Sequence, residues 1–277
     1  MHPAFPRILM RDTRQSSSGF TLVELLIVVA IIGLLAAMLL PALARAKMAA
    51  KKVVCINNER QMSATWVMYS VDNLDRLVLN GGVYPPSSDP KMWIQGVFFY
   101  PESNTNSAYM LDPKYALFAP YLPTTQVYVC PTDRPTVNVD GENYPKIRSY
   151  ALNSFLGWTG PWDIRLSSDY KVFYKYAELT KDMPCGTFTF MDVHPDSICW
   201  PYFGVHMPKD KDSFFNFPNS SHNRGGVVGF ADGHIEYHKW RDQRTITAYA
   251  RRYHDHDQPC DGNEDLAWIR ERTTVKK

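Results

Sequence analysis

Residues 19–40 read GFTLVELLIVVAIIGLLAAMLL, and this stretch decides the fold of the N-terminal part of the chain. Residues 25–40 carry no charge, and Thr21 and Glu24 are the only polar side chains that follow the glycine. At 1.5 Å per residue, a helix of about twenty residues spans the hydrocarbon core of a bilayer. The sequence therefore predicts one membrane-spanning helix over about residues 20–42.

The residues around this start resemble the processing site of type IV prepilins and pseudopilins, which reads Gly-Phe-Thr-Leu-x-Glu before a long apolar helix. Every fixed position of that pattern is present. The resemblance implies that residues 1–19 are a leader, that a membrane aspartyl prepilin peptidase cuts between Gly19 and Phe20, and that the new Phe20 amine is methylated. It also implies a single-pass protein of the bacterial inner membrane with a periplasmic C-terminal domain.

A cleaved secretory signal peptide is the alternative for the same apolar stretch, because Ala42 and Ala44 form a weak small-x-small site. The charges that flank the stretch do not decide its orientation. The leader carries Arg7, Arg11 and Arg14, while Arg45, Lys47, Lys51 and Lys52 follow the stretch. The processing motif therefore has to set the orientation.

Glu24 is a carboxylate near the start of a helix that should enter lipid, where an ionised group is costly. It could remain hydrated at the level of the headgroups. Given the resemblance, it could instead pair with the free Phe20 amine of a neighbouring subunit and so set the register of assembly.

The helix is expected to continue beyond the membrane. Pro41 should kink it rather than end it, because residues 42–50 are strong helix formers. An apolar stripe follows at helical spacing, formed by Cys55, Met62, Trp66 and Tyr69. We therefore expect a helix over residues 20–74 whose second half packs on a globular domain.

Residues 75–277 alternate short apolar runs with Pro, Gly, Asn and Asp, which favours a β-rich domain. Strands are expected over residues 93–100, 127–129, 186–191 and 198–202. The clearest pattern is GVVGFA, then Asp232-Gly233, then HIEYHKW, which predicts a hairpin with a two-residue turn. Together with the long helix, this gives an α+β, pilin-like fold with an antiparallel sheet.

Three short strings resemble a large pseudopilin-like group of planctomycetes and verrucomicrobia that is named for a His-x9-Asp-Gly motif. The strings are CINNERQ at 55–61, CPTD at 130–133 and SYALN at 149–153, and His222 precedes Asp232-Gly233 by nine residues. If Asp232-Gly233 forms the turn, His222 lies near the far end of the hairpin, so we expect no catalytic pair.

Five cysteines follow the membrane segment, and an exported domain would hold them in an oxidising compartment. Cys55 and Cys130 lie in two of the family-like strings, so this pair is the first that we expect to form a disulfide. The odd count leaves at least one thiol free or intermolecular. Five buried thiols are the alternative.

The remaining features argue for assembly rather than catalysis or nucleic-acid binding. Net charge is only +2, and the chain has no Gly-x-Ser-x-Gly, phosphate-binding glycine loop or Cys-x-x-Cys. The oxygen-bearing side chains of Asp255, Asp257, Asp261 and Asn263 suit a calcium site, although their spacing is not that of an EF-hand and a hydrated acidic turn would have the same composition.

We therefore expect a pseudopilin-like subunit, not an enzyme, in a type II secretion or type IV pilus-like filament. The expected partners are a prepilin peptidase, other pilin-like subunits and the inner-membrane assembly platform. The alternative is a membrane-tethered periplasmic ligand-binding protein that uses the pilin signal only for insertion.

Overall fold

The structure is a computed structural model that describes residues 21–82, 85–89, 91–98, 100–133, 135–139, 141–159, 169–183, 186–208, 212–247 and 258–277. The expected cleavage site, Gly19 and Phe20, lies outside the described residues, as do Asp255 and Asp257. The chain divides into two units, Met1–Ala46 and Lys47–Lys277.

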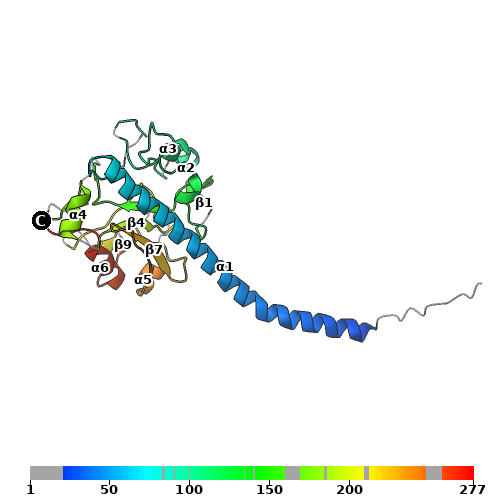
Figure 1. The fold of residues 1–277 in the computed structure, drawn as a ribbon. Helices are drawn as coiled ribbons and strands as arrows, with labels where there is room; N and C mark the ends of the chain where they lie inside the picture. The colour runs from blue at the N-terminus through cyan, green and yellow to red at the C-terminus, as the bar shows by residue number, and fades with distance from the viewer. Residues whose placement is uncertain are drawn as a thin grey trace, which may run out of the picture. The chain divides into compact units, whose positions relative to one another are not determined.

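Helix α1 runs from Leu22 to Asp72 and is the longest element (Figure 1). Its bounds lie within two residues of the expected helix. Pro41 sits inside it, and the helix continues past this residue. The following residues, 42–50, are rich in alanine, which favours helix strongly enough to offset the loss of the hydrogen bond that the proline nitrogen cannot donate.

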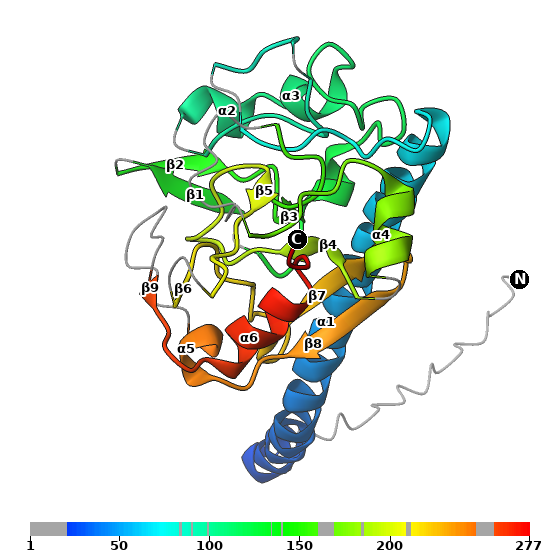
Figure 2. The ribbon, with the colours of Figure 1, turned by 90° about the vertical axis from the view of Figure 1, so that its left-hand side faces the viewer.

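The globular unit is built on a five-stranded sheet in the order β5-β3-β4-β7-β8 (Figure 2). Neighbouring strands are antiparallel except for β3 and β5, which are parallel. The strands are β3 (Tyr150–Asn153), β4 (Phe188–Asp192), β5 (Tyr202–Phe203), β7 (Gly225–Phe230) and β8 (Ile235–Lys239). The α+β fold class expected from the sequence is confirmed.

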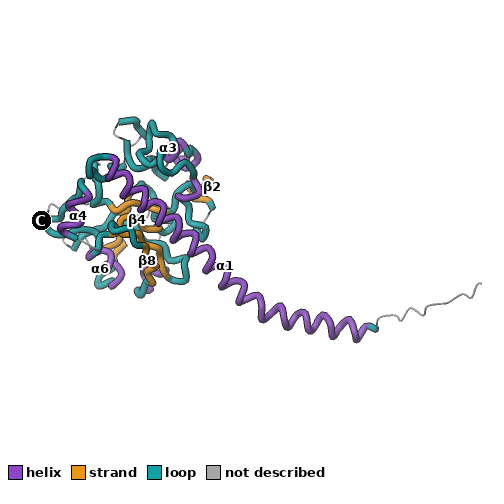
Figure 3. Tube along the Cα trace, viewed as in Figure 1, coloured by secondary structure: helices purple, strands orange, loops and turns teal. Residues whose placement is uncertain are grey.

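Smaller elements surround this sheet, and much of the unit is loop (Figure 3). Two short ribbons pair β1 (Thr136–Val139) with β2 (Glu142–Pro145), and β6 (Ser213–Phe214) with β9 (Gln258–Pro259). The short helices are α2 (Pro101–Thr105), α3 (Ala108–Leu111), η1 (Thr125–Tyr128), α4 (Tyr176–Asp182), α5 (Gln243–Ile246) and α6 (Glu264–Glu271).

Two of the expected strands are wrong, and a third, expected over 198–202, coincides with β5 only at Tyr202 because residues 198–201 are loop. The described part of residues 93–100 is loop, and residues 127–129 end the 3-10 helix η1 and follow it. Both stretches are nonetheless buried, with Trp93, Ile94 and Tyr128 fully covered. A short apolar run shows that a segment is buried but not which backbone conformation it adopts, because strands, loops and single turns can all supply apolar contacts.

The sheet has a hydrophobic core on each face. On one face, the second part of α1 buries Cys55, Met62 and Trp66 in a cluster that includes Phe190 and Val227. This is the packing that the apolar stripe predicted.

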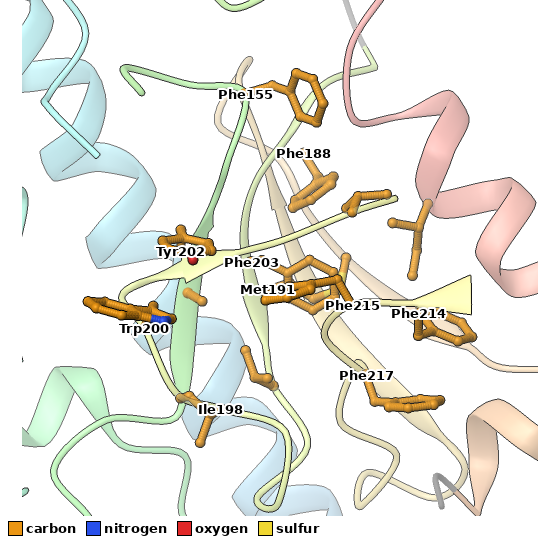
Figure 4. Packing of buried hydrophobic residues seen from close by; sticks show 14 of the residues in the cluster. Phe155, Phe188, Met191, Ile198, Trp200, Tyr202, Phe203, Phe214, Phe215 and Phe217 are labelled. Atoms are coloured by element: carbon orange, nitrogen blue, oxygen red, sulfur yellow. The ribbon is translucent and has the colours of Figure 1, made fainter. Parts of the chain in front are cut away.

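The other face carries a cluster rich in aromatic rings, to which α6 contributes Leu266 and Ile269 (Figure 4). Phe188 and Met191 of β4 point into this cluster, as does Val228 of β7. Successive strand residues point to opposite faces, so β7 can place Val227 in one core and Val228 in the other.

The hairpin of β7 and β8 has the expected strands but a different turn. Gly229 pairs with Ile235, the N–H of Gly233 donates to the carbonyl of Phe230, and the N–H of Phe230 donates to the carbonyl of His234. Only Gly233 has a positive φ in this loop, +88°. The two-residue turn expected at Asp232-Gly233 is therefore wrong, and the loop is a turn completed by a left-handed glycine.

Candidate functional site

Four chemically reactive side chains converge in the core of the globular unit. Cys55 comes from α1, Cys130 follows η1, Asp192 ends β4 and His222 precedes β7. All four are buried, and one ligand atom from each lies within 4.8 Å of all the others. We call these four residues the buried cluster.

Within the buried cluster, Cys55 and Cys130 form a disulfide whose Cα atoms are 5.4 Å apart. This is the pair that the family-like strings implied. It joins α1 to the loop after η1. Two further cysteines, Cys199 and Cys260, are also buried, and Cys260 forms no disulfide.

The imidazole of His222 lies at the centre of the polar contacts. Its Nε2 atom is 3.2 Å from Cys130 Sγ, 3.3 Å from Thr132 Oγ1 and 3.5 Å from Asp192 Oδ2. On the other side of the disulfide, the Tyr150 hydroxyl donates to Cys55 Sγ over 3.1 Å. The string CPTD therefore contacts the histidine of the His-x9-Asp-Gly motif, and SYALN contacts the other sulfur of the same disulfide.

Backbone contacts hold His222 and Asp192 in place. The Tyr237 hydroxyl donates to the His222 carbonyl over 2.7 Å, and the N–H of Val227 donates to Asp192 Oδ1 over 3.1 Å. Gly226 allows this approach, because a Cβ atom there would be 2.8 Å from both Asp192 Oδ1 and the Asn219 carbonyl. The absence of a side chain at Gly226 thus allows β7 to pack closely against Asp192.

Charge is poorly balanced in this part of the core. Glu59, one turn after Cys55 on α1, is fully buried beside Asp192. Burial raises the pKa of Glu59 well above its usual range, and the nearby Asp192 carboxylate raises it further, while the N–H groups of Asp192 and Gly229 oppose the shift.

The other two titratable groups shift in the same sense, toward their neutral forms. Burial raises the pKa of Asp192 well above its usual range, although the hydrogen bond from Val227 opposes this. Burial also lowers the pKa of His222 to about 4, with a contribution from the charge of Lys52. At neutral pH the imidazole is therefore neutral, and it supplies no positive charge to the two carboxyl groups.

The two halves of the His-x9-Asp-Gly motif lie at opposite ends of β7. His222 belongs to the buried cluster, whereas Asp232 lies at the turn, where its Oδ1 atom is 2.5 Å from His234 Nδ1. At about 3.3 Å per residue, the six residues of β7 keep the two apart. This is the separation that the sequence led us to expect, and His222 and Asp232 therefore do not pair with each other as base and orienting acid.

The expected calcium ligands are only partly described. Asn263 is the N-cap of α6, and its Oδ1 atom accepts the N–H groups of Asp265 and Leu266 at 2.9 Å each. The carbonyl of Asp261 accepts a hydrogen bond from Arg244. The role expected for Asn263 is therefore corrected to helix capping, because its oxygen already accepts two bonds. For Asp255, Asp257 and Asp261 the calcium site stays a prediction.

Thr21 and Glu24 close the N-terminus of α1. The N–H of Glu24 donates to Thr21 Oγ1 over 3.2 Å, and the N–H and hydroxyl of Thr21 donate to Glu24 Oε2 over 2.9 and 2.8 Å. This reciprocal arrangement is a capping box. The string Thr-x-x-Glu is the sequence signature of a capping box, so the sequence itself indicates that Glu24 caps the helix, a role separate from hydration or pairing.

The helix behind this cap is apolar on all sides. Apart from the half-buried Ala36, every residue from 21 to 50 is exposed. A stretch of 18 residues in α1 reaches a mean hydropathy of 2.9, and none of it is buried in the structure. By length and composition this helix can cross a membrane, and lipid or other apolar helices would cover its surface.

Comparison with known proteins agrees with this N-terminal geometry. Residues 14–40 match the prokaryotic N-terminal methylation motif. No curated protein and no solved structure matches the chain. The motif indicates a type IV pilin-like substrate of a prepilin peptidase, and the apolar helix indicates anchoring in a membrane.

Proposed function

We propose that this protein is a non-catalytic, pseudopilin-like subunit of a type II secretion or type IV pilus-like filament. In this proposal a prepilin peptidase cuts between Gly19 and Phe20, the Phe20 amine is methylated, and the helix packs against those of other pilin-like subunits. The observation that carries it is the exposed apolar first part of α1, which falls largely within the methylation motif matched at residues 14–40.

The same observation supports a location. One span over about residues 20–42 would anchor the chain in the bacterial inner membrane, with the globular unit in the periplasm. A disulfide between Cys55 and Cys130 is compatible with that oxidising compartment. The inner-membrane assembly platform would then act on the membrane end of α1.

Contacts between helices inside a bilayer need more than apolar surface, because lipid tails are as apolar as the helices. We propose that the carboxylate of Glu24 supplies the missing specificity by pairing with the Phe20 amine of a neighbour. The capping box is compatible with this role, because Glu24 is exposed while it accepts bonds from Thr21.

Processing is tested by mass spectrometry of the protein from native membranes. We expect a mature chain that starts at N-methylated Phe20, and an uncut precursor when Gly19 is replaced by a bulky residue. A chain that starts at Met1, or one cut after Ala42 or Ala44, would contradict the proposal.

Assembly is tested with three variants that separate the charge of Glu24 from its capping role. Glu24→Gln keeps a capping oxygen but loses the charge, Thr21→Ala loses the cap but keeps the charge, and Glu24→Ala loses both. The readout is the yield of cross-linked oligomers, normalised to processed, membrane-inserted protein.

We expect both Glu24 variants to assemble poorly and Thr21→Ala to assemble nearly as well as the wild type. If Glu24→Gln assembles normally while Thr21→Ala fails, Glu24 acts as a cap only. Methylated wild-type protein that gives no oligomers at all would favour the membrane-tethered binding protein instead.

A further inference from the structure

We propose that Cys55, Cys130, Asp192 and His222 hold one Zn²⁺ ion when the two cysteines are reduced. The disulfide and the metal centre would then be two alternative states of the same pair of sulfur atoms. This inference rests on the globular unit alone and does not depend on the proposed assembly function.

The chemistry of the four donors suits zinc. Two thiolates, an imidazole nitrogen and a carboxylate oxygen are all donors that Zn²⁺ accepts, and four of them complete a tetrahedral coordination shell. The thiolates argue against calcium and magnesium, which prefer oxygen donors. The ligating nitrogen of His222 would be Nε2, since this atom faces both Cys130 Sγ and Asp192 Oδ2.

The distances are also those of a nearly formed site. Around a tetrahedral zinc with bonds of about 2.0–2.3 Å, ligand atoms stand roughly 3.3–3.8 Å apart. Nε2 of His222 is 3.2 Å from Cys130 Sγ and 3.5 Å from Asp192 Oδ2, and the four ligand atoms all lie within 4.8 Å of one another. Small side-chain rotations would bring the set around one ion once the sulfur atoms are not bonded to each other.

A second observation points to a cation at this place. Among the described residues, Asp192 Oδ2 and both carboxylate oxygens of Glu59 are buried without a hydrogen-bond partner of ordinary geometry. Buried polar atoms in native proteins nearly always have such a partner. Asp192 Oδ2 faces the buried cluster, so a metal ion there would supply the interaction that this oxygen lacks.

Neighbouring groups would orient the ligands as outer partners do in known metal sites. The Tyr150 hydroxyl already donates to Cys55 Sγ, and the N–H of Val227 already donates to the other oxygen of Asp192. The ligands come from α1, the loop after η1, β4 and the loop before β7. A zinc ion would therefore tie α1 to the sheet, as the disulfide does.

Binding involves no electron transfer. Each thiol loses its proton to solvent as its sulfur bonds to the metal, so the site binds more weakly at low pH. The oxidised pair has no thiolate to offer. The newly made chain, whose cysteines are thiols, is the form that would take up the ion.

The test uses the full-length chain, purified in detergent and kept reduced. We expect about one zinc per chain by elemental analysis after desalting, and none in the oxidised protein. Replacing zinc with Co²⁺ should give the absorption of a tetrahedral site together with sulfur-to-metal charge transfer. His222→Ala and Asp192→Asn should each weaken binding by more than about tenfold, whereas Cys260→Ser, which removes another buried thiol, should keep full binding.

Reduced wild-type protein that retains no metal would overturn the inference. So would a Co²⁺ spectrum without sulfur-to-metal charge transfer, or zinc binding that is unchanged in both His222→Ala and Asp192→Asn. The spectrum of the wild-type protein decides the matter even if a ligand variant fails to fold, because it needs no substitution in the site.

Discussion

Removing the Cys55–Cys130 disulfide should destabilise the globular unit strongly. The bridge closes a loop with a sequence separation of 75 residues. In the chain-entropy description, restricting the unfolded chain over such a loop stabilises the fold by about 4.5 kcal/mol at 25 °C. For a domain of this size, that corresponds to a fall in Tm of roughly 9–18 °C. The double variant Cys55→Ala/Cys130→Ala removes the bridge without leaving either of its two partners as an unpaired thiol.

The measurement is thermal and denaturant unfolding of the oxidised full-length chain in detergent, with the bridge located by non-reducing peptide mapping. Cys260→Ala is the matched control, since it removes a buried thiol that forms no bridge. We expect the double variant to lose several times more stability than this control. Equal losses in the two proteins, or free thiols at both Cys55 and Cys130 in periplasmic protein, would refute the reasoning.

Three further predictions concern the core. Glu59→Gln should raise Tm relative to the wild type, and the difference in Tm between the two proteins should grow from pH 4.5 to 8. Burial raises the pKa of Glu59 in the folded state, so the wild-type fold loses stability at a pH where the unfolded chain has released this proton but the folded chain has not. A difference in Tm that does not change with pH in metal-free protein would contradict this. Gly226→Ala should cost about 1–3 kcal/mol in chemical denaturation, because its Cβ would lie 2.8 Å from two oxygens, whereas Gly186→Ala, with its nearest neighbour at 3.8 Å, should cost less. Trp66→Ala should lower the free energy of unfolding by about 3–5 kcal/mol because the ring is fully buried. Met68 on the same helix is 53% exposed, so Met68→Ala should change the free energy of unfolding by less than about 0.5 kcal/mol. Similar losses in the two variants would show that the apolar stripe does not pack as described.

Some features of this protein follow from sequence because their causes are local. The apolar run and its neighbouring motif predict the long helix, since the sixteen uncharged residues, extended back to Phe20, give about the twenty residues that a membrane span needs. The stripe at Cys55, Met62 and Trp66 predicts which face of α1 is buried, because helical spacing places these residues on one side. The runs on either side of Asp232-Gly233 predict a hairpin for the same kind of reason.

Other features could not be predicted from local sequence patterns, because they depend on contacts between segments that are far apart in the chain. Strand β3 is only four residues long and buried on both faces, so it shows no alternation that would mark it as a strand. The chain at 93–98 and 127–129 has the composition of strands but lies in loop and 3-10 helix. The sequence marks a turn at Asp232-Gly233 but not its length, which is set by the register in which β7 and β8 pair.

The buried cluster is the clearest case of what only tertiary structure decides. Cys55, Cys130, Asp192 and His222 lie on four separate segments, and nothing in their spacing along the chain shows that their ligand atoms lie within 4.8 Å of one another. The family-like strings single out the two cysteines and the histidine, but Asp192 belongs to no string. It joins them because β4 pairs with β7, where glycine permits the strand to approach its carboxylate. The apolar helix and its methylation motif can be predicted from sequence because they depend on residues that are neighbours in the chain, whereas the chemistry of the core depends on contacts between residues far apart in it.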